Sequence, residues 1–300
     1  MKKIKYSICA WIGVAILLIS HTGSKLHAQE MPAYRIFDKN GNKADFVTMI
    51  KQLAQADVVF FGELHNCPVS HWLELKSLEM LHRHNGSAQS VGLEMLEADV
   101  QLILDEYMQK IISPKSYAQE ARLWGNYESD YDPVVYYAKS HGLQVTATNV
   151  PRRYADLVNR KGFAALDSLS VKAKSYLPPL PIPYKRDEAT ERMFDGMRSM
   201  VHGKSDEKRY FAEAQAIKDA TMAWHISLMA KQGYKVLHLN GSFHSDRYEG
   251  IVTYLKRYAP SVRIMTISTV RQDAIDSLED DYRGIADYII GVPADMTHTN

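Results

Sequence analysis

The chain has 300 residues, with 36 lysines and arginines against 35 aspartates and glutamates, and only two cysteines. Apolar residues make up 46% of it and charged residues 24%, which are ordinary values for a globular protein. These numbers exclude a disordered chain, a coiled coil, a collagen-like fibre and a small scaffold held by disulfides.

Residues 1–28 have the three parts of a secretory signal peptide. Three lysines lie within the first five residues, an apolar run covers residues 9–19, and a more polar stretch ends at Ala28. The apolar run is too short to span a bilayer, which needs about 20 residues. We therefore expect cleavage after Ala28 and a mature protein secreted across the inner membrane into the periplasm.

Cleavage after residue 28 changes both the charge and the cysteine content. It removes four lysines and no acidic residue, so the net charge falls from +1 to −3, and such a chain has no electrostatic footprint for nucleic acid. Cys9 lacks the preceding small residue of a lipoprotein site, so a lipid anchor is not favoured. Cys67 then remains as the only cysteine, which excludes an intramolecular disulfide.

Residues 29–300 are predicted to form a single α/β domain, because short apolar stretches alternate with amphipathic helical patterns. The predicted strands are residues 57–61, 90–93, 143–148, 234–239 and 262–267, with a further short edge strand at residues 288–290. The predicted helices are residues 71–84, 98–109, 133–140, 212–231 and 247–258. This order indicates a mostly parallel sheet, flanked by helices and joined by right-handed crossovers.

One segment interrupts the alternation of strands and helices. Residues 152–210 carry helical patterns but no strand, and residues 177–183 contain four prolines. Proline removes an amide donor and restricts the residue before it, so this stretch is unsuited to a sheet. We expect a helical insertion over residues 152–210, with a small subdomain at residues 187–203 packed over the sheet; a plain surface excursion is the alternative.

Polar side chains follow four of the predicted strands, at the point where each strand ends. In the order of the strands they are Glu63 and His65, Glu94, Asn149 and Arg152, and His244. Ligands of open parallel sheets bind outside the carboxyl ends of the strands, so we expect these groups to converge on one site. A buried carboxylate is costly without a partner, and the two histidines are natural partners for the two glutamates.

The helix predicted over residues 212–231 adds a polar face. Gln215, Asp219 and Met222 are spaced by four and three residues, so they share one side of the helix. This pattern is typical of a pocket wall, with a solvent-exposed face as the alternative. His71, at the start of an earlier helix, is expected either at the same pocket or as a flanking residue of its helix.

Taken together, these motifs resemble the ChaN-like haem-binding uptake proteins, whose superfamily includes the TraB and Tiki proteins and the erythromycin esterases. The resemblance is carried by Gly62-Glu63-Leu64-His65-Asn66 with His71, Leu93-Glu94-Met95, Asn149-Val150-Pro151-Arg152, Gln215 with Asp219 and Met222, and Asn240-Gly241 with His244. It implies a parallel α/β sheet with a smaller helical part that binds haem. It also implies two haems face to face in a homodimer, iron held by a tyrosine, and an outer-membrane haem or iron transport system as partner.

No motif identifies the tyrosine that would hold the iron. Tyr176, Tyr184 and Tyr210 are the candidates in the helical part, because a phenolate oxygen is a suitable ligand for ferric haem. The chain has 18 tyrosines, so most of them must have ordinary packing or surface roles.

Two classes of function remain open. The resemblance favours an extracytoplasmic haem-binding protein for the acquisition or storage of haem iron. The strand-end residues alone favour a hydrolase of esterase or metalloprotease type that uses Glu63, His65, Glu94 and His244. In that case Glu63 or His65 activates water as a general base, or His65, His244 and a carboxylate hold a divalent metal that does so. The sequence has no HExxH motif to support the metal route.

Overall fold

The computed structural model describes residues 31–185 and 210–299, and the chain from residue 33 onward forms one compact unit. The predicted signal peptide and the predicted subdomain at residues 187–203 lie outside the described residues. Within the described part, no helix combines the length and the apolar character that crossing a membrane requires.

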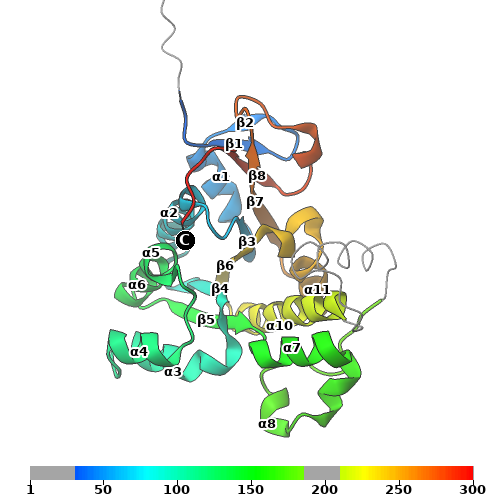
Figure 1. The fold of residues 1–300 in the computed structure, drawn as a ribbon. Helices are drawn as coiled ribbons and strands as arrows, with labels where there is room; N and C mark the ends of the chain where they lie inside the picture. Colours follow the sequence, from blue (N-terminus) through cyan, green and yellow to red (C-terminus); the bar gives the residue numbers. More distant parts are fainter. Residues whose placement is uncertain (1–30, 186–209, 300) are drawn as a thin grey trace, which may run out of the picture. The chain divides into compact units, whose positions relative to one another are not determined.

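An eight-stranded sheet forms the centre of this unit, in the order β2-β1-β8-β7-β3-β6-β4-β5 (Figure 1). Its strands are β1 (Arg35–Asp38), β2 (Lys43–Ala44), β3 (Val58–Glu63), β4 (Gln89–Glu97), β5 (Gln144–Asn149), β6 (Lys235–Gly241), β7 (Ile264–Gln272) and β8 (Tyr288–Pro293). The six strands from β8 to β5 are parallel, whereas β1 pairs antiparallel with β2 and with β8. The predicted α/β class with a mostly parallel sheet is therefore confirmed.

One end of the sheet differs from the prediction. Residues 288–290 are predicted at an edge, but β8 lies between β1 and β7, so that prediction is wrong. The cause is an unpredicted hairpin, β1–β2, which adds two strands beyond β8. Its turn is held by the Asp38 carboxylate, which accepts hydrogen bonds from the amides of Asn40 and Asn42 over 2.8 and 2.9 Å.

Helices cover both faces of the sheet (Figure 1). One face carries α1 (Phe46–Leu53), α2 (Pro68–Asn85), α3 (Gln101–Met108), α4 (Pro114–Glu120), α5 (Tyr127–Asp130) and α6 (Asp132–Ser140). The other face carries α7 (Arg152–Lys161), α8 (Val171–Lys174), α10 (Phe211–Lys231) and α11 (Ile251–Tyr258). Short 3₁₀ turns occupy Gly86–Ala88, Ala98–Val100, Phe163–Ser168, Ser242–His244, Asp246–Tyr248 and Asp280–Tyr282.

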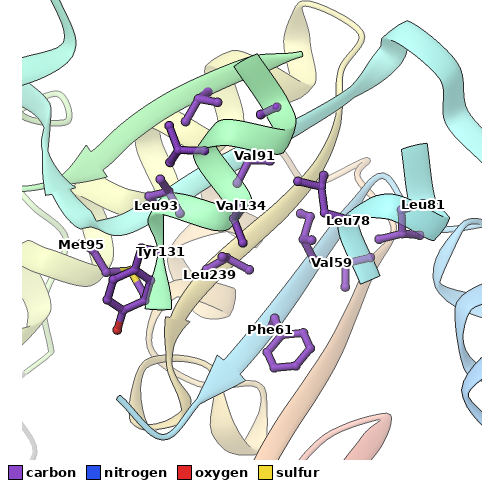
Figure 2. Packing of buried hydrophobic residues seen from close by; sticks show 14 of the residues in the cluster. Val59, Phe61, Leu78, Leu81, Val91, Leu93, Met95, Tyr131, Val134 and Leu239 are labelled. Carbon is purple, nitrogen blue, oxygen red and sulfur yellow. The ribbon is translucent and has the colours of Figure 1, made fainter. Parts of the chain in front are cut away.

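The core lies in two layers, one on each face of the sheet, as strand β3 illustrates. Side chains alternate between the faces of a strand. Val59 and Phe61 pack toward α2 and α6 (Figure 2), whereas Val58 and Phe60 pack toward α10 and α11. Every residue of β3 is buried, which is why this strand reads as apolar on both faces.

Two predicted helices begin later than expected. The helix predicted from residue 247 begins at Ile251, because Arg247 and Gly250 have φ of 57° and 50°, in the left-handed region where a right-handed helix cannot continue. The helix predicted from residue 98 begins at Gln101, after a 3₁₀ turn. The described part of the insertion is helical and irregular, from α7 to α8, and contains no strand.

Candidate functional site

Glu63 ends strand β3, and its side chain is fully buried. The hydroxyl of Tyr131 donates a hydrogen bond to Glu63 Oε1 over 2.7 Å, and His65 Nδ1 lies 2.6 Å from the same oxygen. Tyr131 lies between α5 and α6, and its ring packs at the edge of the buried core (Figure 2). The strand thus carries a carboxylate into the protein interior, where these two partners offset the cost of its burial.

Helix α2 brings His71 to the same carboxylate. His71 Nδ1 lies 3.3 Å from Glu63 Oε2 and 3.2 Å from Glu74 Oε2, which is one helical turn further along. On the other side of the ring, Nε2 lies 3.2 Å from Asp130 Oδ2. All four side chains are buried, so His71 is enclosed by three carboxyl groups.

Burial and mutual contacts set the charges in this first cluster. Burial lowers the pKa of His71, but Glu63 and Glu74 outweigh it and raise the pKa to about 11. Burial raises the pKa of Glu74, and the charge of Glu63 raises it further, so the protonated acid is favoured there. Burial also acts to raise the pKa of Glu63. Hydrogen bonds with its neighbours, of which the one with Glu74 has the largest effect, nevertheless hold this pKa well below its usual range. The cluster therefore holds an imidazolium, a carboxylate and a carboxylic acid.

A second cluster lies at the neighbouring strand ends. Glu94, in β4, accepts a hydrogen bond over 2.8 Å from the amide of Gly241 at the end of β6. His244 lies between two acids, with Nε2 3.3 Å from Glu94 Oε1 and Nδ1 2.6 Å from Asp219 Oδ1. Asp219 comes from α10, so a helix on one face of the sheet completes a site that begins at the strand ends.

The second cluster is also charged at neutral pH. Burial lowers the pKa of His244, but the charges of Glu94 and Asp219 outweigh it and raise the pKa to about 10. Burial acts to raise the pKa of Glu94, yet His244 brings it down to about 2. For Asp219 burial outweighs the effect of His244, and its pKa is raised. Glu94 and His244 are therefore both ionised at neutral pH.

His65 lies between the two clusters and reaches solvent. Its side chain is 44% exposed, whereas that of His71 is 4% exposed. A Cβ at Gly241 would lie 2.7 Å from His65 Nε2, so glycine leaves the room that the imidazole needs. Burial lowers the pKa of His65, but its hydrogen bond with Glu63 and the charge of Glu94 raise it overall. His65 thus contacts the buried carboxylate of Glu63 on one side and solvent on the other.

A groove of about 510 Å³ opens beside the second cluster, along α10 and α11. Gln215 and Asp219 line it from α10, two of the three residues predicted to share a face of this helix. Met222, the third, is fully buried in the core. Tyr184 and Tyr254 also line the groove. The acid that pairs with His244 is therefore part of the groove wall.

Other predicted site residues lie elsewhere. Asn149 ends β5, where its Oδ1 accepts a hydrogen bond from the amide of Val150 over 2.8 Å. The side chain of Arg152 is 75% exposed and lies 3.6 Å from Glu97. The structure brings neither of them into the two clusters or the groove, because β5 is the last strand of the sheet.

Two of the three tyrosine candidates also lie outside the groove lining. The carbonyl of Tyr176 faces the ring of His225, 3.3 Å from its Nε2, and its ring lies under the ammonium of Lys172. Tyr210 directly precedes α10, and its amide donates a hydrogen bond to the carbonyl of Asn159 over 2.8 Å. Tyr184 alone among the three lines the groove.

The metal route predicted from the sequence uses His65, His244 and a carboxylate. Within the described residues, the group of three or more side chains with ligand atoms within 4.8 Å of one another is Glu63, His71 and Glu74. That group is buried in the first cluster and includes neither His65 nor His244.

Comparison with known families identifies the class of protein. The chain matches the family described as haem-binding uptake, Tiki superfamily, ChaN, over residues 49–255, and it belongs to that family. The family predicted from the strand-end motifs is thus confirmed.

Solved structures share the fold. ChaN of Campylobacter jejuni, a structure with cofacial haem binding, is 20% identical with a TM-score of 0.64, over 89% of this chain and 97% of that one. A mutant of the erythromycin esterase EreC in its open conformation is 12% identical with a TM-score of 0.50, over 89% of this chain and 98% of that one. No curated protein matches the chain.

Proposed function

We propose that this chain is an extracytoplasmic haem-binding protein that serves the acquisition or storage of haem iron. Membership of a haem-binding uptake family gives the class of ligand. The observation that carries the proposal is the groove along α10 and α11, where Tyr184 lines a cavity beside basic and apolar residues. The predicted signal peptide at residues 1–28 supports a periplasmic location.

The groove has the chemistry that haem requires. Its volume of about 510 Å³ is within the range of small-molecule sites, about 300–1,000 Å³. Ala212, Ala216 and the half-exposed ring of Phe243 offer apolar contacts for a porphyrin face. Lys185 and Arg257 line the same groove and suit the two propionate carboxylates.

Tyr184 is the residue that we propose as the ligand of ferric iron. A phenolate oxygen supplies an anionic axial ligand that stabilises the ferric state. Tyr254 lines the same groove. Burial raises the pKa of its phenol, and the charge of Asp219 raises it further, so the phenolate form of Tyr254 is disfavoured. Tyr176 and Tyr210 lie outside the groove lining.

We further propose that two copies of the chain bind haem face to face, with delivery to an outer-membrane transport system. The cofacial haem of ChaN from Campylobacter jejuni supports this arrangement. Phe243, 45% exposed at the groove, offers apolar area that a second copy would cover. Hemin should then convert monomer to dimer, a change that light scattering detects.

Titration of the purified protein with hemin tests the haem proposal. We expect a saturable change in absorbance, with a Soret band distinct from that of free hemin and a stoichiometry of one haem per chain. A spectrum unchanged from free hemin, with no saturation, contradicts the proposal.

The paired Glu63 and His65 support a hydrolase as the second candidate. A buried carboxylate orients an exposed imidazole through a contact of 2.6 Å, which is an arrangement suited to acid–base catalysis. Burial lowers the pKa of His65, but Glu63 and Glu94 raise it overall, which shifts its titration toward the charged form that can donate a proton.

Assays with p-nitrophenyl esters and a peptide panel separate the two candidates. If the protein is a hydrolase, His65→Gln should abolish turnover while leaving the fold intact, because His65 is partly exposed. Equal turnover by wild type and variant, or none by either, retires this candidate.

A further inference from the structure

A second cavity, of about 490 Å³, begins at the same 3₁₀ turn as the groove. Ser242 lines this cavity, whereas the next residue, Phe243, lines the groove. Strand β7 and the turns Asp246–Tyr248 and Asp280–Tyr282 supply most of the remaining wall. Among the described residues, the cavity and the groove share no lining residue, so the cavity is a separate site that the proposed haem function does not use.

Two buried polar atoms of strand β7 at this cavity lack partners. Thr269 is 1% exposed, and its hydroxyl has no hydrogen-bond partner among the described residues. Nε of Arg271 is buried and also unpartnered within that part of the chain, while the same guanidinium donates one hydrogen bond to Asn66 Oδ1 over 3.1 Å. Buried polar groups are nearly always satisfied, so two open donors at one cavity point to a ligand with acceptor oxygens.

The cavity is lined by two arginines and by two aspartates, Asp246 and Asp281. Arg247 and Arg271 both line it, and neither forms an ion pair with a carboxylate among the residues described. Arg247 has φ of 57°, a left-handed conformation that is unfavourable for arginine, and its amide donates a hydrogen bond to the carbonyl of Ile285 over 2.7 Å. Such locally strained backbone recurs at ligand sites. Both arginines thus belong to the lining of one cavity.

Asp246 adds an acceptor to the same wall. Burial raises its pKa to about 6, against the opposing effects of Ser268 and Arg247, so it is mostly ionised at neutral pH. A simple anion would meet repulsion from this carboxylate. An anion that also carries a hydroxyl can donate to Asp246 while its oxygens face the arginines.

We propose that this cavity binds a small hydroxycarboxylate. Its carboxylate accepts hydrogen bonds from the two guanidinium groups and from the Thr269 hydroxyl, and its own hydroxyl donates to Asp246. Guanidinium groups match carboxylates through paired, charge-assisted hydrogen bonds, and the hydroxyl distinguishes this ligand from acetate.

Isothermal titration calorimetry with citrate, malate and lactate, beside acetate and inorganic phosphate, tests the proposal. At least one hydroxycarboxylate should bind saturably and about tenfold or more tightly than acetate. Arg271→Gln should weaken that binding by about tenfold or more, and Thr269→Val by about three- to tenfold, since each removes a donor to the ligand. The control Arg160→Gln, at an exposed position of α7 outside the cavity lining, should bind as wild type does.

The stability of Thr269→Val also distinguishes a ligand-binding role of the Thr269 hydroxyl from a structural role. The unpartnered hydroxyl contributes no hydrogen bond to the fold, so the variant should be at least as stable as wild type without ligand. Hemin titration should be unchanged in Thr269→Val and Arg271→Gln, because neither residue lines the groove. The proposal is overturned if no hydroxycarboxylate binds, if phosphate binds more tightly than all three, or if both variants keep wild-type affinity.

Discussion

Replacing His71 by alanine is expected to lower the free energy of unfolding by about 3–5 kcal/mol. The substitution leaves Glu63, Glu74 and Asp130 buried around an empty position, without the cation that now lies 3.2–3.3 Å from each of them. Removing one partner of a buried charge network costs more than a surface pair because the remaining carboxylate has no water to solvate it. Chemical denaturation monitored by circular dichroism measures the change.

The matched control lies on the same helix. His84 is exposed near the end of α2, so His84→Ala should change the free energy of unfolding by less than about 0.5 kcal/mol. A loss for His71→Ala no larger than for His84→Ala contradicts the charge network described for the first cluster.

The sign of the pH dependence gives this prediction a second readout. The folded pKa of His71 is raised to about 11 by Glu63 and Glu74, against the effect of burial, so its contribution to stability is complete below its unfolded value of 6.5 and is lost as pH rises toward 11. Wild type should therefore lose stability over that window. In His71→Gln the slope should be shallower, since the ionisation of His71 no longer contributes.

Tyr184→Phe is expected to weaken hemin binding by at least about tenfold, or about 1.4 kcal/mol. The variant keeps the aromatic ring, and with it the contact to Phe163, whose ring centroid lies 5.5 Å away. It removes the oxygen that we propose as the iron ligand, so the Soret band and the visible bands should shift as well as the affinity. Absorbance titration measures both effects.

Three tyrosines provide controls for that titration. Tyr254→Phe changes a phenol of the same groove, and Tyr176→Phe and Tyr210→Phe change the two candidates outside its lining. All three should keep the wild-type spectrum and bind hemin within about threefold of wild-type affinity. A spectral change in one of them, with Tyr184→Phe unaffected, assigns the iron to that residue instead.

The sequence predicts the parallel core of the fold because burial on both faces leaves a clear pattern. Strands such as Val58–Glu63 begin with an apolar run, and helices such as Ile251–Tyr258 repeat their apolar residues at helical spacing. The hairpin β1–β2 escapes prediction because strands of four and two residues are too short to establish a period. Because the hairpin was not predicted, the sequence placed β8 at the edge of the sheet, although β8 is an internal strand.

The site was predictable where a strand end or a helical spacing places the residue. Glu63, Glu94 and His244 come together because parallel strands end at one edge. Glu74 follows His71 by three residues on a helix, so the sequence contains a signal for it that the strand-end reasoning did not use. Asp130, the last residue of the short helix α5, and Tyr131, which follows it, reach the cluster through tertiary packing that no local pattern encodes.

A crystal structure of the protein grown with hemin tests the central claim most directly. The account predicts haem in the groove along α10 and α11, with its iron bonded to the phenolate oxygen of Tyr184 and its propionates near Lys185 and Arg257. Haem bound at another surface, or iron held by His65 or by a different tyrosine, would contradict it.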